Sequence, residues 1–61
     1  MKELDVVRLK SVFSDLPTGT TGTIVLEYDG KYFEVEFFDE NRDTIAVVTT
    51  PVELLELIQS Y

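Results

Sequence analysis

The sequence predicts a mainly β protein, a small antiparallel barrel of four to five strands followed by a short C-terminal helix. Apolar and polar residues alternate in the two runs that flank Asp29-Gly30, which is the period of a strand. Clusters of Gly, Pro, Asp, Asn and Thr interrupt this alternation and are typical of turns. After Thr50 the apolar residues recur at helical spacing. With 61 residues, the chain is expected to form a single domain over residues 1–61.

The first strand is expected over residues 4–10, where β-branched residues occur with partial alternation. Residues 11–21 are predicted to form a loop, because Pro17 and Gly19 interrupt them. Three apolar residues in this loop are expected to tie it to the core: Val12, Phe13 and Leu16.

Residues 22–38 predict a β-hairpin, which supplies the second and third strands. Asp29-Gly30 is a preferred pair for a two-residue type I′ loop. That loop would place Leu26 opposite Phe33 and Ile24 opposite Val35. The expected core face then carries Ile24, Leu26, Tyr28, Lys31, Phe33, Val35 and Phe37. The opposite face, acidic and facing water, would carry Thr23, Val25, Glu27, Tyr32, Glu34, Glu36 and Phe38.

The remainder of the chain predicts a polar turn over residues 39–43, a fourth strand over residues 44–50, and the helix. Thr50, Pro51 and Glu53 have the pattern of a capping box with proline at the first helical position. The expected core stripe of the helix is Leu54, Leu57 and Ile58, whereas Leu55 and Tyr61 are expected to be more exposed. Four strands, a long first loop and tight later connections favour an SH3-like barrel, and the alternative is an open sheet with the helix across one face.

Composition narrows the functional classes. The net charge is −7, with twelve acidic residues against five cations, so nucleic-acid binding is disfavoured and a basic protein partner is expected. Because cysteine and histidine are absent, we predict no enzymatic activity, no catalytic residues, no cofactor and no metal site. Residues 39–43 resemble the start of a calcium loop, but Thr44 and Thr50 stand where that loop needs Gly and Glu. No membrane span or secretory signal is evident, and a cytoplasmic protein is expected.

Several motifs together resemble a bacterial family of short chains, the domain-of-unknown-function family 4926. The resemblance spans nearly the whole chain and rests on residues 4–9, Leu16-Pro17, residues 22–25, 32–37 and 44–49. It implies an SH3-like barrel and carries no established activity or site residues. It also suggests an antitoxin or immunity role, because such small genes often lie beside toxin-like genes.

The acidic face of the hairpin and the turn that follows it are the predicted partner-binding surface: Glu27, Tyr32, Glu34, Glu36, Asp39 and Glu40. An aromatic residue among carboxylates is typical of an anchor inside a charged rim. We expect a non-enzymatic acidic module, a monomer or weak homodimer, that binds a basic protein. A structural accessory subunit, which would use the C-terminal helix and a sheet edge, is the alternative. A barrel that binds a small molecule or nucleic acid is the third class.

Overall fold

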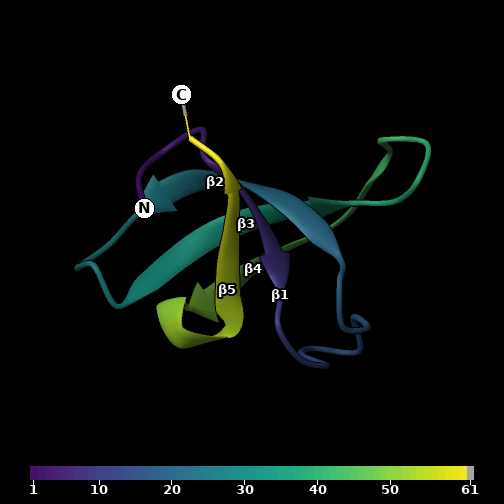
Figure 1. Ribbon diagram of the computed structural model, residues 1–61, viewed down its shortest axis with the longest axis horizontal. Helices are drawn as coiled ribbons and strands as arrows, with labels where there is room; N and C mark the ends of the chain where they lie inside the picture. Colours follow the sequence, from purple (N-terminus) through teal and green to yellow (C-terminus); the bar gives the residue numbers. More distant parts are fainter. Residues whose placement is uncertain (61) are drawn as a thin grey trace.

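The computed structural model describes residues 1–60. Their strands form one open antiparallel sheet (Figure 1). The strands are β1 (Val6–Leu9), β2 (Thr21–Glu27), β3 (Tyr32–Phe38), β4 (Thr44–Pro51) and β5 (Leu55–Gln59). They lie in the order β4-β3-β2-β1-β5, so β5 returns across the molecule to pair with β1. One turn of 3-10 helix, η1 (Val52–Leu54), joins β4 to β5. The predicted mainly β, antiparallel class is confirmed.

The core lies on one face of this curved sheet. Its buried apolar side chains are Val7, Leu9, Leu16, Ile24, Phe33, Val35, Phe37 and Leu55. Strand β4 covers one side of this cluster with the partly buried Ala46 and Val48. In the first loop, Leu16 is buried and Phe13 packs against the core, as expected, but Val12 is exposed and the prediction for it was wrong.

Gly22 lies at the centre of the sheet, where β2 pairs with β1 on one side and β3 on the other. It stands opposite Val7 and opposite Phe37. A Cβ atom at this position would lie 2.7 Å from Cγ1 of Val35 and 2.8 Å from the carbonyl oxygen of Glu36. Only glycine therefore allows the packing of the β3 side chains across β2 at this point.

The predicted C-terminal helix is wrong. Thr50 is buried in β4 and donates its hydroxyl to the carbonyl oxygen of Val48 (3.0 Å) instead of capping a helix. After η1, residues 55–59 are extended and pair with β1. A helix of about two turns is not stable by itself. As a strand, the same segment pairs with the backbone N–H and C=O groups at the free edge of β1 and buries Leu55. The predicted exposure of Leu55 and burial of Leu57 and Ile58 are therefore reversed. Tyr61, expected near the end of that helix, lies outside the described residues.

The hairpin loop has three residues, 29–31, and not the two of the predicted type I′ turn. The backbone N–H of Tyr28 donates to the carbonyl oxygen of Tyr32 and closes the loop. Gly30 has a positive φ of 84°, but Asp29 does not, so the turn cannot be type I′. Instead, Oδ1 of Asp29 accepts the backbone N–H groups of Lys31 (2.9 Å) and Tyr32 (3.2 Å). The aspartate therefore stabilises the turn through its side chain.

A bulge at Val25 accommodates the extra loop residue and changes the faces of the hairpin. The pair Ile24–Val35 has the predicted register, but beyond the bulge Leu26 stands opposite Glu34 and Glu27 opposite Phe33. Side chains alternate along a strand, so Leu26 belongs to the acidic side of the sheet and Glu27 to the side of Phe33. The predicted faces are thus confirmed for residues 23, 24 and 32–38, and they are wrong for Leu26, Glu27 and Tyr28.

Asp5 links the beginning of the chain to the residue that follows β5. This aspartate is buried, with 1% of its surface exposed. Its carboxylate accepts hydrogen bonds from the backbone N of Lys2 (2.9 Å), from Nζ of Lys2 (3.0 Å) and from Oγ of Ser60 (3.0 Å). Burial alone would raise the pKa of Asp5, but these hydrogen bonds and the Lys2 charge outweigh it and lower the pKa to about 2. We call this set of contacts the Asp5 clasp.

Leu4 lies in the turn of the Asp5 clasp with a φ of 76°, so the first strand starts at Val6 and not at the predicted residue 4. Within residues 1–60, no helix has the length and apolar character needed to cross a membrane.

Candidate functional site

The face of the sheet opposite the core carries carboxylates together with exposed aromatic and aliphatic side chains. From strand register, the side chains on this face include Leu26 on β2, Tyr28 directly after β2, Tyr32, Glu34 and Glu36 on β3, and Val47 and Thr49 on β4. Tyr28 and Val47 are more than half exposed, at 53% and 56%. We call this surface the outer face.

Hydroxyl groups hold the carboxylates of the outer face in place. Oη of Tyr28 donates to Oε2 of Glu34 (2.9 Å), and Oγ1 of Thr49 donates to Oε1 of the same carboxylate (3.1 Å). Glu36 accepts a hydrogen bond from Oγ1 of Thr44 (3.0 Å). Tyr28 directly follows β2 and Thr49 lies in β4, so Glu34 is held from both sides of β3.

The same contact affects Tyr28. Its hydrogen bond to Glu34, together with partial burial and the negative charge of that carboxylate, raises the pKa of the Tyr28 hydroxyl. The hydroxyl therefore remains a donor to Glu34 well beyond neutral pH.

No cation neutralises these carboxylates among the residues that the structure describes. Its two ion pairs are Lys2 with Asp5 and Arg8 with Glu56, and neither involves β3. Neutral hydroxyl donors therefore orient Glu34 and Glu36 but do not balance their negative charge.

Glu27 does not join the other predicted partner-binding residues. It is exposed, but the bulge at Val25 places it on the side of Phe33. Tyr32, Glu34 and Glu36 lie together on the outer face, as predicted. The sequence interpretation missed Leu26 and Tyr28, which the bulge moves to this face. A signal was present, because a three-residue loop containing glycine is also a common hairpin connection.

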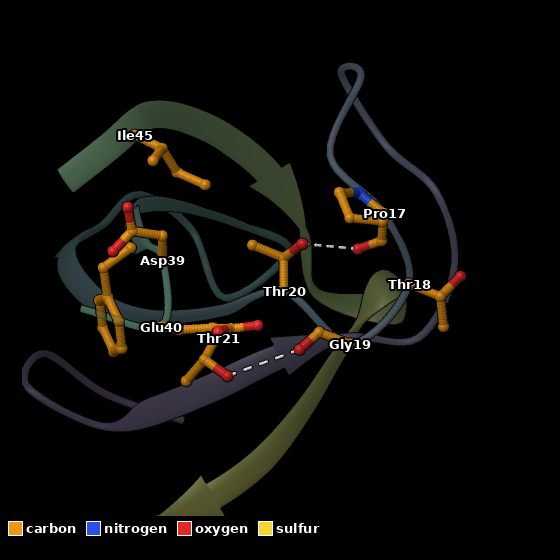
Figure 2. A pocket seen from close by; sticks show the side chains of 9 residues that line it. Pro17, Thr18, Gly19, Thr20, Thr21, Asp39, Glu40 and Ile45 are labelled. Atoms are coloured by element: carbon orange, nitrogen blue, oxygen red, sulfur yellow. Dashed lines mark hydrogen bonds between the residues drawn. The ribbon is translucent and has the colours of Figure 1, made fainter. Parts of the chain in front are cut away.

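A groove of about 370 Å³ lies beside the outer face, between the first loop and the β3–β4 turn (Figure 2). It is lined by Pro17, Thr18, Gly19, Thr20, Thr21, Phe38, Asp39, Glu40 and Ile45. Two of the predicted partner-binding residues, Asp39 and Glu40, form part of its wall. The first loop supplies the opposite wall.

Hydrogen bonds within the two loops shape this groove. On one wall, Oγ1 of Thr20 donates to the carbonyl oxygen of Pro17 (2.7 Å). On the other, Oδ1 of Asp39 accepts the backbone N–H groups of Asn41 (2.8 Å) and Asp43 (3.0 Å), which confirms the polar turn over residues 39–43. Asp39 is thus partly a structural residue. Glu40 accepts no hydrogen bond from another residue among those described here.

A second, smaller cavity of about 190 Å³ lies at the other end of the outer face, where Lys31, Tyr32, Pro51, Val52 and Glu53 line it. It combines one cation with one carboxylate and so has no single charge preference. Residues 1–60 contain no cluster of three or more His, Cys, Asp or Glu side chains placed to hold a metal ion. What the described surface offers chemically is oriented negative charge beside exposed apolar and aromatic groups.

Comparison with known proteins gives a family but no activity. Neither the curated proteins nor the solved structures include a significant match to this chain. The model of one family matches residues 3–57, which is nearly the whole chain. The resemblance inferred from the motifs is therefore confirmed, and the chain belongs to the family described as a domain of unknown function, DUF4926.

Proposed function

We propose that this protein is a non-enzymatic, acidic protein-binding module that engages a basic protein through its outer face. In its concrete form, the module is an antitoxin or immunity protein, and it covers the groove in which a basic nuclease-like toxin would bind nucleic acid. The observation that carries the proposal is the pair Glu34 and Glu36, held by hydroxyl donors and without ion pairs within residues 1–60.

The surroundings of these carboxylates support recognition of a protein surface. Leu26, Tyr28 and Tyr32 are exposed on the same face and offer apolar and aromatic contact area. Binding interfaces commonly combine such anchors with a charged rim. With a net charge of −7, the protein would also attract a basic partner over a distance, which raises the association rate.

We infer that the sheet closes into an SH3-like barrel. The strand order β4-β3-β2-β1-β5, the long first loop and the 3-10 turn before the last strand support this inference. A closed sheet would also leave less free strand edge for aggregation. We further propose a cytoplasmic location, and the absence of cysteine is compatible with such a reducing compartment.

The test is to immobilise the purified protein, pass a lysate of the source cells over it, and identify the retained proteins by mass spectrometry. The variant Glu34→Lys/Glu36→Lys should lose a basic protein that the wild type retains, and salt should slow association of the purified pair. The control Glu3→Lys/Glu27→Lys makes the same charge change at exposed carboxylates off the outer face. Retention of the partner by the Glu34→Lys/Glu36→Lys variant, in protein that remains folded by circular dichroism, would refute the proposal.

The alternative is a structural accessory subunit that joins a larger assembly. Strand β5 favours this candidate, because it is at an edge of the sheet and exposes Leu57 and Ile58, at 46% and 49%. An Ile58→Lys variant should then abolish assembly, while Glu34→Lys/Glu36→Lys should not. The opposite result would favour the outer face.

A further inference from the structure

The groove beside the outer face has walls of two different kinds. Figure 2 shows Ile45, Asp39 and Glu40 on one side and the segment from Pro17 to Gly19 on the other. Ile45 is 47% exposed, and Pro17 is exposed at the facing wall. Its volume of about 370 Å³ is within the range of ordinary ligand pockets. The carboxylates of Asp39 and Glu40 border the apolar surface of Ile45 and Pro17.

The charge at this border has one sign. Asp39 uses Oδ1 to close its own turn, which holds the carboxylate in one orientation. Glu40 follows it directly and takes part in neither ion pair of the described chain. The nine lining residues include no Lys or Arg. An anionic ligand such as a phosphate would meet only repulsion here, and a wholly apolar ligand would leave the two carboxylates unused.

We propose that this groove binds a long cationic side chain, arginine or lysine, of the basic partner. Such a side chain lays an aliphatic stem along apolar surface and keeps its charged head at a polar rim. Here the stem would contact Ile45 and Pro17, and the head would reach Glu40 and the free oxygen of Asp39. The inference rests on the proposed function, since it identifies how the same partner is recognised beside the outer face.

A second copy of this chain is a poorer occupant. Each copy carries a net charge of −7, and two of its five cations are already paired, Lys2 with Asp5 and Arg8 with Glu56. Bringing two such chains together opposes like charges, whereas a basic partner is complementary.

The experiment is a titration of the 15N-labelled protein followed by two-dimensional NMR. The probe is the blocked peptide acetyl-Gly-Arg-Gly-amide, its lysine counterpart is a second arm, and its citrulline counterpart is the uncharged control of matched shape. The arginine peptide, the lysine peptide or both should cause saturable shifts in the amide signals of Gly19, Thr20, Glu40 and Ile45. The citrulline peptide should cause little shift in the same signals. Glu40→Gln should weaken this binding about three-fold or more, as for a partly exposed ion pair. Glu27→Gln, the same charge change outside the groove, should not.

Each of four results would overturn the inference. The first is that the groove signals do not shift with either cationic peptide, and the second is that the citrulline peptide shifts them as strongly as the arginine peptide. The third is that the shifts spread equally over carboxylates elsewhere. The fourth is that the groove signals depend on protein concentration without peptide, which would identify a second copy as the occupant. Failure of the proposed function looks different, because the Glu34→Lys/Glu36→Lys variant would then keep the partner. If that variant loses the partner and the groove is silent, the function stands and only this inference fails.

Discussion

Asp5 and Glu34 are both carboxylates held by several hydrogen bonds, yet their surroundings differ in kind. Asp5 is buried and receives a cation, Lys2, together with the hydroxyl of Ser60. Glu34 is half-buried and receives only the hydroxyls of Tyr28 and Thr49. The ammonium group of Lys2 balances the negative charge of Asp5, so this buried carboxylate stabilises the fold. Neutral donors orient the second carboxylate and leave its charge unbalanced, which agrees with the proposed role of Glu34 in recognition.

The largest effect is expected from Gly22→Ala, which affects both regions at once. Gly22 pairs with β1, next to the Asp5 clasp, and with β3, which carries Glu34. The added methyl group would overlap Val35 and the backbone of Glu36, so we expect a loss of about 3 kcal/mol in the free energy of unfolding. Urea denaturation measures it, with Thr18→Ala on the exposed loop as control. A loss no greater than that of the control would contradict the packing described for β2.

Asp5→Asn should affect the first region alone. Above about pH 4, the depressed pKa of Asp5 favours the folded state, because the unfolded carboxyl has a normal pKa near 4 and the folded one has a pKa of about 2. This contribution is lost as the pH falls from about 4 to about 2. The variant should therefore be less stable at pH 6, and the gap between the two proteins should close on acidification. Thermal melts from pH 6 to pH 2 measure this, and a gap that stays constant would exclude the clasp as its cause.

Tyr28→Phe should affect the second region and be felt in binding more than in stability. It removes one of the two hydroxyls that orient Glu34, at an exposed site. We expect weaker partner binding with only a small change in melting temperature. In the wild type, the raised pKa of Tyr28 favours the folded state below about pH 10, and this contribution is lost as the pH rises further. If stability falls sharply at neutral pH while binding is unchanged, the contact serves the fold instead.

Glu27→Gln should have the smallest effect. Glu27 is exposed and lies on the opposite side of the sheet from Glu34 and Glu36. Its replacement should change the free energy of unfolding by no more than about 0.5 kcal/mol and leave partner binding intact. Isothermal titration with the purified partner, next to Glu36→Gln as the positive comparison, measures the difference. Equal losses for the two variants would mean that both sides of the sheet contact the partner.

Most of the candidate surface was accessible from sequence because it depends on strand alternation. Tyr32, Glu34 and Glu36 are in one strand at spacing two, so their common face needs no knowledge of the rest of the chain. The face on which Glu27 lies depends on the length of the hairpin loop. One extra loop residue places Glu27 on the side of the sheet that carries Phe33. The groove was not accessible at all, since Pro17 and Ile45 are far apart in sequence and only the fold brings them together.

Local chemistry in the sequence determined strands β2, β3 and β4, the turn over residues 39–43 and the apolar residues Ile24, Phe33, Val35 and Phe37 of the core. These features need only alternation and turn residues. Tertiary structure decided the bulge at Val25 and the conformation of residues 55–59. A segment with a good helix cap and a helical spacing became a strand because β1 had a free edge. Pairing there satisfies backbone groups along β1 and buries Leu55, which an isolated helix of about two turns cannot match.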